Sequence, residues 1–508
     1  MKHCNIQYGN DVKQKALQVL KSNKVAVFVV AYNAEKKVLS VLKRIPDWIF
    51  KNLYEIYVID DSSTDDTFEK LTASRLPEDS PPFHIYKTPY NLGYGGNQKM
   101  GYRYAVKKKI DIVILLHGDG QYAPESMPLI LEQYANTENQ PDAVFGTRFG
   151  ITGHPLKGGM PLYKWIGNRI LTFIQNKLAG TSMTEMHSGY RSYKCACLKK
   201  LPFALNSNDF HFDAEIILQH LAAGYTIKEV DIPTYYGDEI CHVNGIKYAW
   251  NCVKTFIKFR LMQIEIFYDP KFDIKPESET KYKPKQATSS LHHYIRSLNI
   301  SENAKIADVG GGNGEAVAKL FAEKHHVVCI DSSAEESLTG DGVIRIKQDL
   351  NKDWAFEKNQ FDIVFALDIL EHLHSPEQGA ANLFSIMKSG GTLYASTGNI
   401  AYFVIRFMLL TGQFNYGRRG ILDLTHTRLM TISSFARLLR NAGFKITAKR
   451  GFGPPVKDLQ SDSVILSLID KVCSISAKIW PSMFAFSILL ICTRPDSIQD
   501  LTEKTFKN

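Results

Sequence analysis

The sequence predicts an α/β fold arranged in two domains. Short apolar runs alternate with helical patterns in both halves of the chain, as they do in layered α/β proteins. At 508 residues the chain is too long for one hydrophobic core. The alternation breaks over residues 269–289, where three prolines stand among charged residues, a composition typical of a linker. We therefore expect one domain over residues 1–268 and a second over residues 290–508.

The predicted strands share an apolar composition and a short length. In the first half they lie near residues 25–31, 54–60, 111–116 and 142–146. In the second half they lie near residues 304–309, 326–331, 361–367, 391–396, 444–450 and 484–493. Helical patterns between successive strands predict parallel sheets. Ligands of such sheets bind beyond the carboxyl ends of the strands, so the polar residues that follow each strand are the candidate site residues.

Composition limits the binding partners and the cellular locations that can be expected. The chain has 61 Lys and Arg against 52 Asp and Glu, a net charge of +9 without a basic cluster, so no nucleic-acid partner is expected. No apolar run reaches the roughly 20 residues that span a bilayer, so no transmembrane segment is expected. The eight cysteines show no zinc-knuckle spacing, and no signal-like apolar core follows the first residues. We expect a cytoplasmic protein, with peripheral contact at the inner face of the membrane left open.

Acidic residues follow two of the strands in the first half. Asp60 and Asp61 end the second strand, where a carboxylate can accept hydrogen bonds from a base or a ribose; helix capping is the alternative. The third strand delivers His117, Asp119 and Gln121 to the same edge. Divalent cations prefer oxygen ligands and bridge diphosphates, so Asp119 is the main candidate metal ligand, for Mg or Mn. His117 is a second ligand, a diphosphate donor, or a structural residue.

Five motifs make residues 25–250 resemble a family-2 glycosyltransferase of the GT-A fold, in the dolichyl-phosphate-mannose-synthase-like branch. The motifs match at Tyr32-Asn33-x-Glu35, Asp60 through Thr67, Asn91 through Gly96, Gly146 through Arg148, and Ser188 through Arg191. The resemblance implies inverting transfer of a sugar from a nucleotide sugar to a glycan or lipid-linked acceptor. It assigns donor contacts to Ala31, Tyr32, Glu35, Asp60, Asp61, Gln121, Arg148 and Arg191.

The same resemblance implies a catalytic base and shows two departures. Asp213 lies where the family places an acidic residue near the acceptor; favourable charge at a helix start is the alternative. His117 replaces the first aspartate of the family's Asp-x-Asp, which weakens the case for a metal. The basic pair expected after Ile232-Pro233 is missing, which weakens the case for a lipid-phosphate acceptor. Residues 248–268 predict a basic amphipathic helix that rests on a membrane or packs between domains.

The second half contains a glycine loop after its first strand. Asp308, Gly310, Gly312 and Gly314 form a strand-turn-helix signature whose glycines let a ligand approach the backbone. Asp331 ends the next strand, where an acid would hold ribose hydroxyls. This layout alone serves either NAD or S-adenosylmethionine, so the residues that follow must decide between them.

Later landmarks make residues 290–495 resemble a class I S-adenosylmethionine-dependent methyltransferase. Asp349 matches an acidic position near the adenine, and Asp368 follows the fourth strand. If the methyl acceptor is a hydroxyl, a base is needed, and His372 and His426 are candidates, although each could be structural. Residues 400–420 are expected to form an acceptor lid or ordinary apolar packing.

Together the two halves predict a bifunctional enzyme for which S-adenosylmethionine and a nucleotide sugar are the donors. A methylated cell-surface glycan or glycolipid is the expected product. One alternative is a methyltransferase whose first half only binds or targets a glycan. RNA methylation is the other alternative, and the absence of a basic cluster disfavours it.

Overall fold

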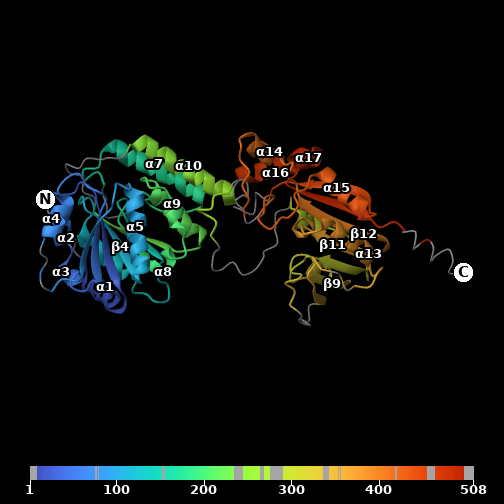
Figure 1. Cartoon of the computed structure of the whole chain (residues 1–508), viewed down its shortest axis with the longest axis horizontal. Helices are drawn as coiled ribbons and strands as arrows, with labels where there is room; N and C mark the ends of the chain where they lie inside the picture. The colour runs from blue at the N-terminus through green and yellow to red at the C-terminus, as the bar shows by residue number, and fades with distance from the viewer. Residues whose placement is uncertain are drawn as a thin grey trace. The chain divides into compact units, whose positions relative to one another are not determined.

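A computed structural model describes residues 8–74, 77, 79–150, 155–233, 244–263, 268–274, 290–335, 342–352, 354, 356–417, 420–454, 464–496 and 501. The chain divides into two compact units (Figure 1). Unit 1 comprises Met1–Arg260 and Asp269–Thr280, and unit 2 comprises Leu261–Tyr268 and Lys281–Asn508. Most of the predicted linker, residues 275–289, lies outside the described residues. Its described part packs on unit 1, where Lys271 forms an ion pair of 2.5 Å with Glu215.

Unit 1 is built on a seven-stranded sheet in the order β3-β2-β1-β4-β6-β5-β7. Its strands are β1 (Val25–Ala31), β2 (Glu55–Asp60), β3 (Phe83–Lys87), β4 (Ile112–His117), β5 (Ala143–Thr147), β6 (Arg191–Lys194) and β7 (Ile227–Asp231). The four predicted strands are confirmed as β1, β2, β4 and β5. The expectation of a parallel sheet is wrong at one strand, because β6 runs antiparallel to both β4 and β5.

Helices cover the sheet of unit 1. They are α1 (Asn10–Ser22), α2 (Val38–Lys43), α3 (Asp47–Phe50), α4 (Thr67–Ala73), α5 (Tyr94–Lys107), α6 (Met127–Glu132), α7 (Leu162–Ala179), α8 (Cys195–Leu198), α9 (Phe212–Ala222) and α10 (Gly245–Gln263). Strands β1, β2 and β4 are continuous apolar runs because helices bury both of their faces. Helix α5 packs so closely on β1 that a Cβ at Gly101 would come within 2.0 Å of the Phe28 ring.

Unit 2 holds a second seven-stranded sheet, in the order β10-β9-β8-β11-β12-β14-β13. Its strands are β8 (Lys305–Val309), β9 (His326–Asp331), β10 (Val343–Lys347), β11 (Phe361–Leu367), β12 (Met387–Gly398), β13 (Lys445–Phe452) and β14 (Ser487–Thr493). The six predicted strands are confirmed, and β10 was not predicted. The first five strands pair in parallel, whereas β14 is antiparallel to β12 and β13.

The helices of unit 2 vary in length from 4 to 16 residues. They are α11 (Leu291–Arg296), α12 (Ala318–Phe321), α13 (Pro376–Ile386), α14 (Phe403–Leu410), α15 (Ile432–Asn441), α16 (Val464–Ile479) and α17 (Pro481–Phe484). Helix α15 begins with a capping box in which Thr431 and Ser434 bond each other's backbone N–H groups. None of the helices in the described ranges is long and apolar enough to cross a bilayer.

Candidate active sites

The site in unit 1 lies at the carboxyl edge of β1, β2 and β4. The strand order reverses between β1 and β4, and ligands of open α/β sheets bind at such a switch point. Parallel register brings Ala31 opposite Asp60 and Val30 opposite His117. The predicted strand-end residues therefore share one edge of the sheet.

The paired aspartates at the end of β2 fix the backbone around them. Asp60 is fully buried and accepts bonds from the N–H (3.1 Å) and the hydroxyl of Ser63. These bonds lie within the turn after β2 and do not cap α4, whose N-cap residue is Asp66. Asp61 accepts the N–H groups of Leu92 (2.8 Å) and Gly93 (2.9 Å) and so anchors the loop that enters α5. Burial raises the pKa of Asp61. Direct contact of either carboxylate with a nucleotide stays a prediction.

The residues that follow β1 differ in exposure. Ala31 is buried, and its carbonyl accepts the N–H of Asp61. The Tyr32 side chain is exposed at the sheet edge, where a planar base could pack on its ring. Glu35 is half-buried and pairs with Lys70 at 3.4 Å. These positions leave Tyr32 as the residue after β1 that is most open to a ligand.

The two candidate metal ligands at the end of β4 have different surroundings. Asp119 is exposed, and its Oδ1 accepts the N–H of Gln121 at 2.9 Å. His117 is enclosed: its Nε2 lies 3.4 Å from the Tyr94 hydroxyl, and a Cβ at Gly189 would come within 2.6 Å of that nitrogen. Burial lowers the pKa of His117, so the ring is neutral.

Asp213 joins this edge from the first turn of α9. Its carboxylate accepts bonds from the Tyr94 hydroxyl (2.8 Å) and from Nε2 of Gln98 (3.2 Å). Tyr94 therefore lies between His117 and Asp213, which the sequence placed in separate roles. Tyr94 and Gln98 were not predicted as site residues. Their spacing of four on α5, directly after the glycine-containing loop, is the signal that could have found them.

Arg191 is buried beside Asp213. Its side chain has no exposed surface and donates to the carbonyls of Met186 (3.0 Å), Ser188 (2.7 Å) and Asp213 (3.0 Å). Its guanidinium also lies 3.6 Å from the Asp213 carboxylate. A buried cation must be paired within the protein, so Arg191 supports Asp213, and its contact with a donor stays a prediction.

Arg148 is likewise paired with protein groups. It is buried, and its Nε lies 2.9 Å from Oε1 of Glu185 while its Nη2 pairs with the same carboxylate. Asn168 of α7 donates to that carboxylate at 3.0 Å. The charge of Arg148 is compensated inside unit 1 by Glu185, and its contact with a donor stays a prediction.

The side chains at this edge do not by themselves form a complete set of metal ligands. Within the described ranges, no group of three or more His, Cys, Asp and Glu side chains could hold one. Asp119 is exposed and offers a carboxylate, whereas the ring of His117 is enclosed by its neighbours. A cation at this edge would therefore need the oxygens of a diphosphate as further ligands.

The site in unit 2 surrounds the glycine loop after β8. Gly310, Gly312 and Gly314 have positive φ angles of 79°, 59° and 77°. At Gly311 a Cβ would come within 2.3 Å of the Asp308 carboxylate, so this position has no room for a side chain. Glycines along the loop let a ligand meet its backbone. Asp308 accepts the Ala318 N–H at 3.1 Å, and burial raises its pKa to about 7.

Two more acids stand at neighbouring strand ends. Asp331 ends β9, and its carboxylate accepts the N–H of Gly312 at 2.9 Å and both the N–H and hydroxyl of Ser333 at 2.8 Å. Asp349 follows β10, is half-buried, and accepts the N–H of Asn351 at 3.0 Å. The structure thus brings Asp331 to the glycine loop and places Asp349 one strand further along the same edge.

The turn after β11 carries a fourth aspartate and a buried glutamate. Asp368 has a positive φ of 50°, and its Oδ1 accepts the hydroxyl of Ser396 at 2.6 Å. Glu371 is 2% exposed, and within the described residues its Oε2 has no hydrogen-bond partner. Burial, reinforced by the charge of Asp368, raises the pKa of Glu371 to about 8. The sequence motif contained Glu371, but only its burial marks it as unusual.

The two histidines predicted as bases are neighbours. Their ring centroids lie 4.6 Å apart, and Nδ1 of His426 lies 3.0 Å from the Ile421 carbonyl. Nδ1 of His372 lies 2.9 Å from the Thr425 hydroxyl, which itself donates to Asp423 at 2.6 Å. The single hydroxyl proton of Thr425 is committed to a carboxylate that only accepts, so Thr425 must accept from Nδ1–H of His372. This series of hydrogen bonds leaves Nε2 of the neutral His372 ring without a proton.

The segment predicted as an acceptor lid or as apolar packing is buried on one face and exposed on the other. Tyr402, Ile405 and Met408 are buried in a small apolar cluster with Phe486, whereas Phe407 on the other face of α14 is exposed. Arg418 and Arg419 lie outside the described residues. The described part of this segment is packed in place, with one apolar face left open.

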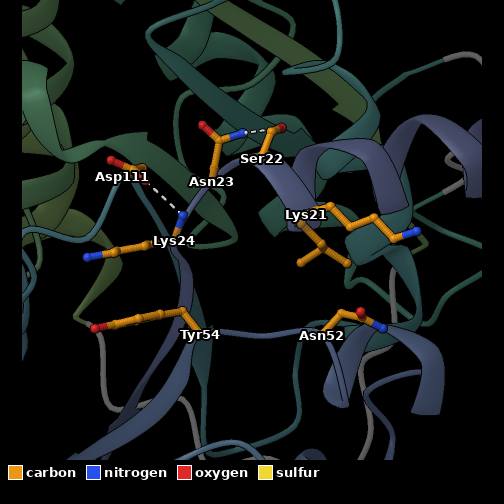
Figure 2. A pocket seen from close by; sticks show the side chains of 8 residues that line it. Lys21, Ser22, Asn23, Lys24, Asn52, Tyr54 and Asp111 are labelled. Carbon is orange, nitrogen blue, oxygen red and sulfur yellow. Dashed lines mark hydrogen bonds between the residues drawn. The ribbon is translucent and has the colours of Figure 1, made fainter.

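A shallow pocket of unit 1 lies at the opposite edge from the predicted site. It opens at the amino ends of β1 and β4, between Lys21, Lys24, Tyr54 and Asp111 (Figure 2). Asp111 accepts the N–H of Lys24 at 2.8 Å, which ties the two strand starts together. None of the predicted site residues lines this pocket.

Two family models match the chain. The model for glycosyl transferase family 2 matches residues 26–201, and the model for a methyltransferase domain matches residues 282–449. The first range contains the switch-point edge of unit 1 up to Arg191. The second contains the glycine loop, Asp331, Asp368 and both histidines.

Three curated relatives cover one part of the chain each. An uncharacterized protein of Methanocaldococcus jannaschii is 30% identical over 264 residues, which are 50% of this chain and 99% of that protein. The UDP-N-acetylglucosamine–dolichyl-phosphate N-acetylglucosaminyltransferase of Methanococcus voltae is 27% identical and covers 42% of this chain and 86% of its own. The ubiquinone biosynthesis O-methyltransferase of Azoarcus sp. is 30% identical and covers 29% of this chain and 66% of its own.

Solved structures also align with parts of the chain. Glucosyl-3-phosphoglycerate synthase of Mycobacterium tuberculosis with bound UDP aligns at a TM-score of 0.37 and 15% identity, over 53% of this chain and 88% of its own. An S-adenosylmethionine-dependent methyltransferase of Mesorhizobium loti aligns at a TM-score of 0.28 and 15% identity, over 40% of this chain and 95% of its own.

Proposed function

The chain belongs to glycosyltransferase family 2 through its first unit and carries a methyltransferase domain in its second, and from this premise we propose that it is a bifunctional enzyme of glycan biosynthesis. Unit 1 transfers a sugar from a nucleotide sugar with inversion, and unit 2 transfers a methyl group from S-adenosylmethionine. Relatives named for dolichyl-phosphate and undecaprenyl-phosphate acceptors support a surface glycan or glycolipid as the product. Both donors are cytoplasmic metabolites, so we place the enzyme in the cytoplasm.

The observation that carries the transferase proposal is the fixed orientation of Asp213. Inverting transfer to a hydroxyl needs a carboxylate that accepts its proton. Tyr94 and Gln98 of α5 each donate to Asp213, and the Arg191 guanidinium of β6 lies 3.6 Å from the oxygen that Gln98 contacts. A residue held from two neighbouring elements in one orientation at the switch-point edge is suited to receive a proton at a defined place.

Asp119 is the proposed contact between unit 1 and a cation. It is exposed at the end of β4, where the donor diphosphate would supply the remaining oxygen ligands. A bound Mg or Mn ion would stabilise the charge of the departing diphosphate. Tyr32, Asp61 and Gln121 lie along the same edge and are the proposed donor contacts.

Nucleotide-sugar turnover, with and without manganese or magnesium, tests the transferase half. Asp119→Asn should keep the fold but lose several kcal/mol of transition-state stabilisation, so turnover should drop by orders of magnitude. His117→Ala should lose less, because the ring is enclosed and reaches no outward-facing partner. Wild-type turnover in Asp119→Asn would remove the metal assignment. An inactive wild-type chain with intact glycan binding would favour the alternative, a glycan-binding module.

In unit 2 we assign the base to Nε2 of His372. The relay from Asp423 through Thr425 fixes the proton on Nδ1, so Nε2 can accept one from the nucleophile. Burial and the neighbouring His426 lower the pKa of His372, which keeps the ring neutral. His426 is the weaker candidate, because its Nδ1 bonds a carbonyl and it faces His372 edge to face.

Two measurements test this assignment. In a nitrogen-15 NMR spectrum of labelled histidines, the His372 signals, identified through His372→Gln, should show the Nδ1–H tautomer. A base must be neutral, and the lowered pKa moves its protonation to lower pH. Methyl transfer should therefore hold its rate down to the usual histidine pKa of about 6.5 and fall only below it. An Nε2–H tautomer would assign the base elsewhere.

A further inference from the structure

A short segment after α10, residues 269–274, packs on unit 1, and we call it the strap. The carbonyl of Asp269 accepts the Phe272 N–H at 3.0 Å, and its Oδ1 accepts the Lys271 N–H at 3.1 Å. Phe272 is 4% exposed, and its ring meets Phe259 of α10 edge to face at a centroid distance of 5.3 Å. The strap is therefore fixed by its own turn and by one buried ring.

Lys271 of the strap pairs with a buried carboxylate on α9. Its Nζ lies 2.5 Å from Oε1 of Glu215, whose side chain is 2% exposed. The Lys271 carbonyl accepts a hydrogen bond from Nε2 of Gln219, one turn further along α9, at 3.1 Å. Loss of one partner of such a pair leaves a buried charge uncompensated, which is strongly destabilising. Lys271 therefore fixes the position of Glu215, and both lie beyond residues 26–201, which the glycosyl transferase model matches.

Glu215 and Gln219 extend this support to the loop that precedes α9. The other oxygen of Glu215, Oε2, accepts the Ser207 N–H at 2.5 Å. Gln219 and Asn206 exchange two amide hydrogen bonds of 2.8 and 3.0 Å. Buried polar groups are costly to leave without their partners. The loop at residues 206–208 is therefore held by the two side chains of α9 that Lys271 contacts.

The same loop supports the start of α5. The Asn208 carbonyl accepts the N–H groups of Gly95 (2.8 Å) and Gly96 (3.3 Å). The Asn208 side chain accepts a hydrogen bond from Nζ of Lys99, one turn further along α5, at 2.7 Å. Residues 206–208 thus connect the face of α9 that the strap contacts to the first turns of α5.

Tyr94 and Asp213 lie at the end of this series of contacts. Tyr94 directly precedes Gly95, and its hydroxyl donates to Asp213 at 2.8 Å. Asp213 and Glu215 are two residues apart on α9, and residues at this spacing do not share a helix face. Lys271 therefore acts on Asp213 through the loop and Tyr94 and not by direct contact.

We propose that Lys271 is a positioning residue for sugar transfer, because its support of residues 206–208 fixes the Tyr94 hydroxyl that orients Asp213. The inference rests on the proposed function, in which Asp213 accepts the proton of the acceptor hydroxyl. A small displacement of a group that receives a proton lowers the rate strongly, even when its cause lies far from the reacting atoms. The domain that transfers the sugar therefore includes residues 269–274, which the sequence assigned to the linker.

Sugar transfer by the full chain tests the proposal, with UDP-N-acetylglucosamine and dolichyl phosphate, named for the Methanococcus voltae relative, as probes. Lys271→Met should lower kcat roughly ten- to a hundredfold. The KM for the nucleotide sugar should stay the same, because the proposed donor contacts lie at the ends of β1, β2 and β4. Lys271→Arg keeps the charge and should restore most of the rate. The matched control is Lys194→Met, which breaks another partly buried pair, 3.8 Å from Asp142, and should leave kcat unchanged.

Hydrogen exchange of the full chain without substrates gives a second readout. In Lys271→Met, peptides that contain Gly95 and Gly96 should exchange at least about tenfold faster, because the loop that accepts their N–H groups has lost its support. Peptides from β4 should keep the wild-type rate, which excludes general unfolding. Lys271→Arg and Lys194→Met should exchange like the wild type. Lys271→Gln, which can still donate a hydrogen bond to Glu215, gives the same test if Lys271→Met does not fold.

Unchanged exchange at Gly95 and Gly96 in Lys271→Met would overturn the proposal, as would an equal change in Lys194→Met. An active wild type whose kcat does not fall in Lys271→Met, or falls equally in Lys271→Arg, would overturn it as well. A wild type that is inactive with these probes, together with faster exchange in Lys271→Met, would count against the proposed function but keep the positioning by Lys271. The two proposals therefore fail separately.

Discussion

Replacing Asp331 by alanine tests the cofactor site of unit 2 most directly. If this carboxylate holds ribose hydroxyls of S-adenosylmethionine, each hydrogen bond to the charged group contributes roughly 1.5–3 kcal/mol. Asp331 also accepts the Gly312 N–H at 2.9 Å, so the change removes a support of the glycine loop at the same time. A loss of this size corresponds to an affinity roughly ten- to a hundredfold lower.

Isothermal titration calorimetry with S-adenosylmethionine measures this loss without knowledge of the methyl acceptor. Ser333→Ala is the matched control, because it removes a 2.8 Å bond to Asp331 but leaves the carboxylate in place. Its affinity should fall by less than about tenfold. Asp331→Asn keeps the shape and one acceptor oxygen, and its affinity should lie between the other two. Wild-type affinity in a folded Asp331→Ala chain would refute the reasoning.

Three further changes have expected outcomes. A fragment of residues 1–274 should melt at a higher temperature than one of residues 1–268, because the longer piece buries Phe272 in unit 1; equal melting would remove this boundary. Asp308→Asn should stabilise unit 2 more at pH 8 than at pH 5: the folded pKa of about 7 lies above the ordinary aspartate value of 3.8, so the free energy of unfolding of the wild-type unit falls as pH rises through that window. Thr425→Val should shift the neighbouring histidine away from the Nδ1–H tautomer in nitrogen-15 spectra, whereas Thr425→Ser should not.

The strands that the sequence predicted are those whose burial shows in local composition. Strands β1, β2 and β4 are continuous apolar runs, and each lies within a residue of its predicted bounds. Strands β3, β6, β7 and β10 escaped prediction. The residues of β3, β7 and β10 are largely half-buried or exposed and include lysines or acids, and β6 is four residues long with Arg191 and Lys194 at its ends. Strand order and the antiparallel direction of β6 and β14 depend on pairing between distant segments, which no local pattern encodes.

The site was predictable in position but not in side-chain direction. Strand ends located Asp61, Asp119 and Asp331 correctly at the carboxyl edges of the sheets. A motif does not say where a guanidinium points, so the burial of Arg148 and Arg191 could not be foreseen. The contact of Tyr94 with Asp213 joins residues 119 positions apart and follows only from the packing of α5 on α9.

The histidines show what structure adds to a motif. In the sequence, His117 and His372 are each a histidine that follows an apolar strand, and a structural role was the alternative for both. His117 is closed in by Tyr94 and by Gly189, so its ring can do little more than support Asp213 through Tyr94. His372 is half-buried as His117 is, but Thr425 fixes one of its nitrogens so that the other can accept a proton. The same residue type is therefore a packing element in one unit and the proposed base in the other, and the partner of a single ring nitrogen decides which.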